Sequence, residues 1–314
     1  MEELGHVVVL SGGLSYEREV SLRSGRRVAE ALRGAGVEVV ARDADVMLLD
    51  LLTADPPDAV LPVLHGAAGE DGAIRDVLEL MGLPYVGARP DACRVAWDKP
   101  TAKAVVRRAG LRTPESVALP KEVFHDLGAA AVLRLVISRL GLPLFVKPSR
   151  GGSALGAAVV RDAADLSAAM VGCFAYGDTA LIEQYVEGTE LAVTVLELPE
   201  PQALPAVEIV PSGPMYDYAA RYGSGDTDFY APARLAGDIQ DAVARAAVTA
   251  HQALGLRDLS RTDLIVDSAG EIHFLEVNVA PGMTETSLLP MAVEAAGLDL
   301  GGVLRDLIAQ RCFS

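Results

Sequence analysis

The sequence predicts an α/β protein of more than one domain, with an α+β fold in its central part. Strand-like and helix-like segments alternate from residue 6 to residue 87, which is typical of a parallel sheet flanked by helices. Short strands at 143–147, 157–160 and 180–185, with a helix starting at Asp162, favour an antiparallel sheet backed by helices. The chain has 314 residues, which is too long for one ordinary core at roughly 150 residues a domain.

The N-terminal region begins with a strand, a glycine turn and a helix. Residues 6–11 are apolar and mostly β-branched, Gly12 and Gly13 follow, and Ser15 can cap a helix through about residue 32. Further elements are predicted as strands at 37–40 and 59–64 and a helix at 70–81. Parallel strands gather ligand groups at their C-terminal ends, so we expect Glu19 and His65 at one sheet edge. A lone histidine there is more often a satisfied turn residue than a catalyst.

Composition limits the classes of partner. The chain is 51% apolar and 22% charged, which favours folded domains, and its net charge of −16 disfavours general binding to nucleic acid or anionic membranes. Three scattered cysteines fit neither a disulfide framework nor a zinc site. The N-terminus lacks the features of a signal peptide, and the apolar run at 129–146 contains two arginines. We therefore expect a cytoplasmic protein that binds no membrane.

Two loops have the composition of ligand-binding segments. Residues 149–156, SRGGSALG, follow the strand that carries Lys147, and three glycines can turn backbone N–H groups toward a phosphate, although the Walker order is absent. A flexible surface hairpin is an equally good interpretation of this stretch alone. Residues 211–230 form a tyrosine-rich loop between strands at 191–197 and 206–210 and a helix at 238–254. A loop of this length indicates disorder or a functional lid, and the tyrosines favour a lid.

The strongest local signal is a hairpin near the C-terminus. Apolar strands at 264–266 and 272–277 flank a turn at 267–270, and two helices at 287–296 and 300–310 follow. Alternation places Glu276 and Asn278 on one face, and Asp263 joins them if the strands pair in register. These three oxygen ligands suit Mg²⁺, with Arg261 on the same face to hold a phosphate or an oxyanion. A half-buried hairpin with a solvated acidic edge is the competing interpretation.

Taken together, these stretches resemble the D-alanine–D-alanine ligases of the ATP-grasp superfamily. The resemblance covers nearly the whole chain, with the pieces in the family's order. The matching pieces are GGLSYEREVSL at 12–22, LHGAAGEDG at 64–72, ELMGLPYVG at 79–87, WDKPTAK at 97–103, VKPSRGGSALG at 146–156, YDYAARY at 216–222 and FLEVNVAPGMTETSLLP at 274–290.

The resemblance implies three domains, with ATP held between the central and C-terminal ones. Their expected ranges are 1–88 for the substrate-binding domain, 89–186 for the central subdomain with its phosphate loop, and 187–314 for the subdomain with the lid and metal site. It implies that two D-alanines are joined at the expense of ATP for peptidoglycan precursor synthesis, with two Mg²⁺ ions, or Mn²⁺ in their place. We also expect a homodimer.

The resemblance also assigns roles to individual residues. Lys99 and Lys147 would contact the nucleotide phosphates, and Glu183 and Glu190 the adenosine end. Arg261 and the Gly282 N–H would stabilise charge on the reacting carboxyl group. The remaining assignments are Glu19 for the ammonium of the first D-alanine, hydrogen-bonded to Ser153 and Tyr222, Ser287 for the carboxylate of the second, and Asp263, Glu276 and Asn278 for the metal ions.

Two positions depart from the family pattern, Arg221 and Gln184, where lysine is usual, and they concern lid behaviour and nucleotide affinity. Three other functions stay open. An ATP-grasp ligase for other carboxylates would keep the metal and phosphate residues but would have no reason to keep YEREVSL or YDYAARY. A D-alanyl-D-lactate depsipeptide ligase would share the ATP site, although Tyr222 favours the dipeptide enzyme. A non-catalytic nucleotide-binding protein would be expected to lack some metal or phosphate ligand, and this chain retains all of them.

Overall fold

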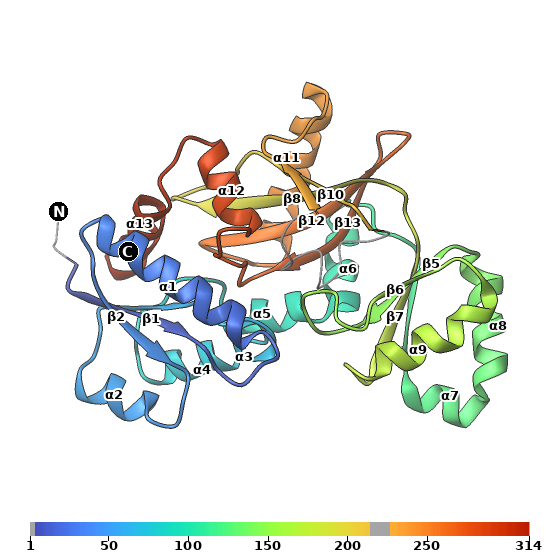
Figure 1. Cartoon of the computed structure of the whole chain (residues 1–314), viewed down its shortest axis with the longest axis horizontal. Helices are drawn as coiled ribbons and strands as arrows, with labels where there is room; N and C mark the ends of the chain where they lie inside the picture. The colour runs from blue at the N-terminus through green and yellow to red at the C-terminus, as the bar shows by residue number, and fades with distance from the viewer. Residues whose placement is uncertain (1–3, 214–226, 314) are drawn as a thin grey trace.

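The computed structural model describes residues 4–213 and 227–313, and it confirms the α/β class. Three sheets, each with its own helices, lie along the longest dimension of the molecule (Figure 1). The first sheet lies at the lower left of that view, the largest at the upper centre and the third at the right. Within the described residues, no helix is long and apolar enough to cross a membrane.

The N-terminal sheet is parallel, as predicted, with strand order β2-β1-β3. Its central strand β1 is buried and apolar, so helices can cover both of its faces. Pairing of Val9 with Ala41 and with Leu61 brings the C-terminal ends of the three strands to one edge. The elements are β1 (His6–Ser11), α1 (Arg18–Gly34), β2 (Glu38–Asp43), α2 (Leu48–Ala54), β3 (Ala59–Pro62), α3 (Ala67–Glu70) and α4 (Ala73–Leu80).

The central sheet is antiparallel, in the order β4-β7-β5-β6, which confirms the predicted α+β character of this part. Two consecutive helices at 121–140 were not predicted from the sequence. Apolar residues of the second, Val136 and Leu140, pack against Leu144 and Ile182 of the sheet. The elements are β4 (Ser116–Pro120), α7 (Lys121–Leu127), α8 (Ala129–Leu140), β5 (Leu144–Pro148), β6 (Ala158–Val160), η1 (Ala163–Asp165), α9 (Leu166–Phe174) and β7 (Thr179–Gln184).

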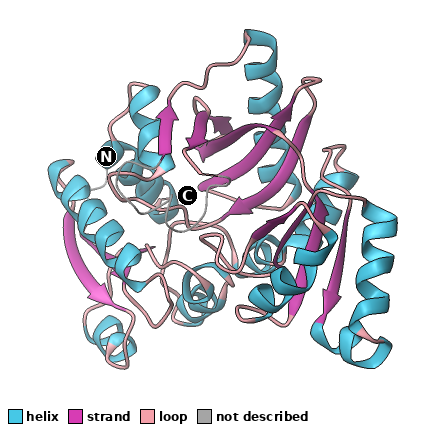
Figure 2. Ribbon diagram, turned by 45° about the vertical axis from the view of Figure 1, so that its right-hand side comes forward, coloured by secondary structure: helices cyan, strands magenta, loops and turns pink. Residues whose placement is uncertain are grey.

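The largest sheet has the order β11-β10-β8-β12-β13, with β9 paired to β8, and all of its pairings are antiparallel. Figure 2 shows its strands as a group separate from those of the central sheet. Its elements are β8 (Gly188–Glu197), β9 (Pro201–Ala203), β10 (Val207–Pro211), β11 (Thr227–Tyr230), α11 (Gly237–Ala253), β12 (Leu259–Asp267), β13 (Ile272–Asn278), α12 (Leu288–Ala295) and α13 (Leu300–Cys312).

Helix packing crosses the divisions expected from the sequence. The helices α5 (Pro90–Trp97) and α6 (Lys99–Arg108) precede the central sheet in the chain, yet Cys93 and Val106 pack in one core with Leu264 and Phe274 of the largest sheet. The last helix, α13, packs on α1 of the N-terminal region. The three sheets occupy separate stretches of sequence, and the residue boundaries of the domains stay a prediction.

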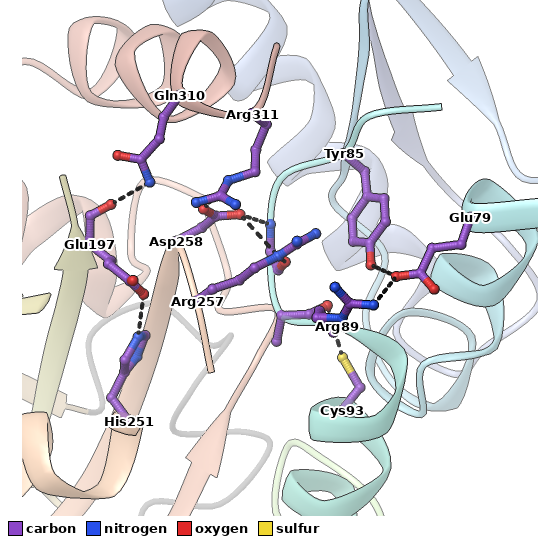
Figure 3. Close-up of polar contacts among 12 residues, drawn as sticks. Glu79, Tyr85, Arg89, Cys93, Glu197, His251, Arg257, Asp258, Gln310 and Arg311 are labelled. Carbon is purple, nitrogen blue, oxygen red and sulfur yellow. Dashed lines mark hydrogen bonds and ion pairs between the residues drawn. The ribbon is translucent and has the colours of Figure 1, made fainter. Parts of the chain in front are cut away.

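A buried carboxylate joins the N-terminal region to the largest sheet (Figure 3). Asp258 Oδ2 accepts a hydrogen bond of 2.7 Å from the Gly87 N–H, and its Oδ1 lies 2.8 Å from Arg311 Nε. Arg257 donates to the Gly87 carbonyl at 2.8 Å, and its guanidinium stacks over the Tyr85 ring. The chain therefore leaves the N-terminal region at a point held by β12 and by the last helix.

Candidate active site

The predicted hairpin is present, and its register unites the predicted metal ligands. Asp263 on β12 pairs with Glu276 on β13, and Arg261 pairs with Asn278. Directly opposed residues of an antiparallel pair point to the same face. All four side chains therefore belong to one face, and an irregularity in the pairing between Asp263 and Leu264 marks the point where they gather.

Arg261 and Asp263 form a bidentate ion pair. Arg261 Nε donates to Asp263 Oδ1 at 2.7 Å and its Nη2 donates to Oδ2 at 2.8 Å, with both side chains buried. Two parallel charge-assisted bonds fix the guanidinium plane. The sequence placed this arginine beside the metal ligands, and the structure shows that it balances one of their charges directly.

Lysines and glutamates alternate along the next part of the site. Lys147 Nζ lies 3.1 Å from Glu183 Oε2 and 3.3 Å from Glu276 Oε2, and Lys99 Nζ lies 3.9 Å from the same Glu276 oxygen. The other oxygen of Glu183 contacts Lys103, which is fully buried and was not among the predicted site residues. The series comes from α6, β5, β7 and β13, so it lies where the central and largest sheets meet.

Burial and opposite charges act against each other in this series. Burial lowers the pKa of Lys103 to about 8, although Glu183 opposes that change. Lys147 is also buried, but its two carboxylate neighbours outweigh the desolvation and raise its pKa. For Glu183, burial is likewise outweighed, by Lys103 and Lys147, so the pKa of its carboxyl is lowered. Lys147 and Glu183 are therefore held in their charged forms by each other and by their neighbours.

These residues line a cleft of about 1220 Å³, including the part open to solvent. Its lining includes the glycine-rich loop, both lysines, Asp263 and Glu276, and the apolar side chains of Phe145, Tyr185 and Ile209. A cleft that combines charged groups with apolar side chains has the chemistry to hold a nucleotide. The predicted residues that line it are Lys99, Lys147, Glu183, Glu190, Asp263 and Glu276.

The glycine-rich loop closes this cleft and holds two residues in an unusual conformation. Ser153 and Ala154 have φ values of +53° and +54°, the left-handed region that L-residues seldom adopt. The loop is tied down at its base, where the Lys99 N–H donates to the Ser149 carbonyl at 3.0 Å and Lys99 Nζ donates to the Gly151 carbonyl at 2.6 Å. This backbone conformation is strained, and strained residues of this kind are common at ligand-binding sites.

A second, smaller hollow of about 500 Å³ lies beside the first, and Gly152 borders both. It collects residues from all three sheets, and Arg261 lies in it while its partner Asp263 lies in the cleft. The predicted site residues that line it are Ser153, Arg261, Asn278, Gly282 and Ser287. Its lining also includes Glu17, His65 and Glu70.

One predicted residue is wrong. Ser153 Oγ donates a hydrogen bond to Glu17, and Glu17 is 6% exposed, whereas Glu19 is exposed and borders neither cavity. The buried face of α1 carries Val20, Ser24 and Val28. Residues of one helix face are three or four positions apart, so counting back three from Val20 reaches Glu17 rather than Glu19. Helical periodicity could therefore have identified the correct residue.

His65 and Glu70 are both buried and have partners. His65 Nδ1 lies 3.0 Å from the Ala280 carbonyl oxygen and Nε2 lies 3.2 Å from Ser24 Oγ, and burial lowers its pKa to about 4. The histidine is thus a satisfied neutral group, as its position after a strand suggested. Glu70 accepts from the Gly66 N–H at 2.8 Å, and burial, followed by repulsion from Glu17, raises its pKa to about 8.

Gly282 and Ser287 belong to a tight turn before α12. Ser287 Oγ accepts from the Thr284 N–H at 2.9 Å, and a Cβ on Gly282 would lie only 2.7 Å from that same oxygen. Only glycine therefore fits at 282 with this turn in place. Tyr222 and Arg221 lie outside the described residues. Gln184, where the family pattern has lysine, donates to the Leu140 carbonyl at 2.9 Å.

The donor set at the hairpin fits a hard divalent cation. Asp263, Glu276 and Asn278 offer carboxylate and carboxamide oxygens, the donors that Mg²⁺ prefers. Asn278 Oδ1 accepts from the Ala280 N–H at 2.8 Å, which fixes its orientation. Across residues 4–213 and 227–313, no group of three or more His, Cys, Asp or Glu side chains is arranged to hold a metal ion. The candidate site therefore consists of two carboxylates and one carboxamide.

Comparison with known proteins gives consistent matches over the chain. A family model described as D-ala D-ala ligase C-terminus matches residues 105–309, and one described as D-ala D-ala ligase N-terminus matches residues 46–88. A D-alanine–D-alanine ligase of Desulforudis audaxviator is 40% identical over 301 residues, covering 96% of each chain.

Solved structures resemble the whole chain as well. The VanG D-Ala:D-Ser ligase of Enterococcus faecalis superposes with a TM-score of 0.83 at 29% identity, covering 98% of this chain and 99% of that one. A D-alanine–D-alanine ligase of Bacillus anthracis, solved in complex with ATP, gives a TM-score of 0.79 at 27% identity and covers 98% and 96%.

Proposed function

Because the chain belongs to the D-alanine–D-alanine ligase family, we propose that it joins two D-alanines through an acyl phosphate formed with ATP. The likeness to solved ligases confirms the predicted ATP-grasp architecture. The observation that carries the proposal is the pair of adjoining cavities, divided by the Arg261–Asp263 ion pair and sharing Gly152. One cavity has the shape and charge for a nucleotide, and the other is small and lined with polar groups.

The reaction needs two groups brought together and a carboxylate made electrophilic. An oxygen of the first D-alanine carboxylate attacks the γ-phosphorus of ATP, ADP leaves, and the amine of the second D-alanine attacks the resulting acyl phosphate with loss of inorganic phosphate. Phosphoryl transfer depends mainly on positioning and charge neutralisation. Lys99 and Lys147 line the cleft and would supply fixed cations to the phosphates, so the transfer needs no nucleophilic serine or cysteine.

Asp263, Glu276 and Asn278 would hold Mg²⁺, with Mn²⁺ as an alternative. When bound, the metal would supply positive charge at the phosphate groups of the nucleotide. Arg261 lies against Asp263, and Lys147 lies against Glu276.

The smaller cavity accounts for the two amino acids. Glu17 takes the role first assigned to Glu19, because its carboxylate is buried beside Ser153 and suits an ammonium group. Arg261 and the Gly282 N–H would stabilise the charge that develops on the reacting carboxyl group. Ser287 would bind the carboxylate of the second D-alanine. Glu183 and Glu190 would contact the adenosine end of the nucleotide.

Some expectations stay predictions. These are the lid role of 211–230 with Tyr222, the homodimer, the cytoplasmic location and the domain boundaries. None of the alternative functions named in the sequence analysis is favoured. The described residues retain every predicted phosphate-binding and metal-binding side chain, which opposes a non-catalytic role, and no feature of the smaller cavity indicates a lactate hydroxyl.

A phosphate-release assay tests the proposal. The purified protein, ATP and Mg²⁺ are combined with D-alanine, D-serine, D-lactate or L-alanine, and phosphate and products are measured. We expect phosphate release in equal amounts with D-alanyl-D-alanine. Phosphate release that is independent of D-alanine, or that yields mainly depsipeptide when D-lactate is added to D-alanine, would contradict it.

A further inference from the structure

Lys103 is a fully buried cation with no part in the reaction outlined above. It lies on α6 one turn after Lys99, and its side chain is 1% exposed. Its ammonium contacts Glu183 Oε1 and lies 3.4 Å from the Phe274 carbonyl oxygen. Burying an ammonium group is costly unless it has a charged partner, so its presence indicates a role tied to Glu183.

Glu183 serves two lysines with separate oxygens. Oε1 contacts Lys103, and Oε2 lies 3.1 Å from Lys147 Nζ. Glu183 is itself 1% exposed, so its charge must be balanced by these neighbours rather than by water. If Lys103 were absent, Lys147 would be the one cation left in contact with this carboxylate among the residues that the structure describes.

The position of Lys147 matters because it has competing partners. Its Nζ lies between Glu183 and Glu276, at 3.1 and 3.3 Å. A nucleotide phosphate must compete with both carboxylates for this ammonium. A cation at the other oxygen of Glu183 partly neutralises the charge of this carboxylate. Glu183 then attracts Lys147 less strongly and competes less with a phosphate for it.

We propose that Lys103 is a positioning residue for nucleotide binding, which neutralises Glu183 from within the core and so leaves Lys147 available to a phosphate group. The inference rests on the proposed nucleotide site and adds a residue and a function to it. Lys103 contacts Glu183 but does not line the cleft, so it would not touch a nucleotide bound there. Burial lowers its pKa to about 8, which leaves it mainly charged at neutral pH.

The purely structural alternative gives a different result. A lysine that only tied α6 to β7 would, when lost, disturb the whole cleft and weaken adenosine as much as ADP. A residue that acts through Lys147 weakens phosphate binding much more than adenosine binding, because Glu183 keeps its place beside Lys147 in the variant. Its effect also disappears when Lys147 is already absent.

The test is a double-mutant cycle on ADP affinity, measured by calorimetry with Mg²⁺ present. The variants are Lys103→Met, Lys147→Met and the double variant. Lys121→Met, an exposed lysine paired with Asp178 on the central region, is the matched control. We expect Lys103→Met to weaken ADP by about tenfold, as for loss of a charge-assisted hydrogen bond, and adenosine by less than about twofold. In the Lys147→Met background the same change should have less than about a twofold effect.

Three results would overturn the inference. One is wild-type ADP affinity in Lys103→Met, the second is an equal loss for ADP and adenosine, and the third is the same fold loss in both backgrounds. Each of these assumes that the wild-type protein binds ADP. A wild-type protein that binds no ADP would instead refute the nucleotide site, and with it the proposed function.

A second pair of variants covers the case in which Lys103→Met does not fold. Glu183→Gln and Glu183→Gln with Lys103→Met both avoid an unbalanced buried carboxylate. Because Lys103 acts by neutralising Glu183, the two variants should bind ADP equally within about twofold. A further tenfold loss in the double variant would show that Lys103 acts by another route.

Discussion

Ser153, on the glycine-rich loop, donates a hydrogen bond to Glu17 at the start of α1, 136 positions earlier in the chain. Both side chains are buried. This contact joins the N-terminal region directly to the loop that closes the nucleotide cleft. If an amino acid binds at Glu17 and a phosphate at the loop, as proposed, the two binding events would involve the same local structure.

Glu17→Gln should strongly reduce turnover, while Glu19→Gln should not. Glutamine keeps the size of the side chain but removes the charge that pairs with a substrate ammonium. We expect kcat/KM for D-alanine at the first site to fall by about 10²–10³, corresponding to roughly 3–4 kcal/mol. Steady-state kinetics on both variants measure this.

The comparison is internally controlled, because the two glutamates are two residues apart on one helix. Glu19 is exposed, so its substitution tests for effects of charge near α1. Equal losses in the two variants, or a larger loss in Glu19→Gln, would show that the ammonium site is wrongly placed.

Glu276→Gln should nearly abolish turnover and also weaken the Mg²⁺ dependence of ADP binding. The substitution removes a negative charge from the donor set without changing its volume. We expect the rate to fall by about 10²–10³. Glu271→Gln, an exposed position on the same hairpin paired with Arg112, is the control and should behave like wild type. Calorimetry with and without Mg²⁺ gives a readout separate from activity, and an unchanged Mg²⁺ effect would exclude Glu276 as a ligand.

Much of this site could be predicted because it depends on local rules. The hairpin follows from alternation and a turn sequence, so the pairing of Asp263 with Glu276 was accessible from the chain alone. The choice between Glu17 and Glu19 depended on which face of α1 is buried. Lys103 was missed for a related reason, since a lysine in a helix is ordinarily exposed and only the packing of α6 against β7 and β13 buries it.

Other parts of the fold could not be predicted because they depend on contacts between residues far apart in the sequence. The sequence does not predict α7 and α8. The helix α8 lies in the apolar run at 129–146, and its packing on the central sheet determines which of its apolar residues are buried. The packing of α13 on α1 and of α5 on β13 joins parts of the chain that are far apart in sequence. No periodicity in one sequence indicates such contacts, and the domain boundaries stay a prediction.

Stability should fall in acid partly through His65. Burial lowers the pKa of this histidine from 6.5 to about 4, so the folded state favours its neutral form. Its contribution is complete above pH 6.5 and is lost as the pH falls through 4, amounting to roughly 3 kcal/mol. We expect the difference in free energy of unfolding between wild type and His65→Gln to shrink between pH 7.5 and 4.5, as measured by urea titration. A difference that does not depend on pH would contradict this.

The acyl phosphate is the central claim, and oxygen transfer tests it most directly. In the proposed reaction one carboxylate oxygen of the first D-alanine leaves with the phosphate. D-alanine labelled with ¹⁸O in its carboxylate is incubated with ATP, Mg²⁺ and the protein, and the inorganic phosphate is analysed by mass spectrometry. We expect one ¹⁸O atom in the phosphate for each D-alanyl-D-alanine formed. Dipeptide accompanied by unlabelled phosphate would contradict the account.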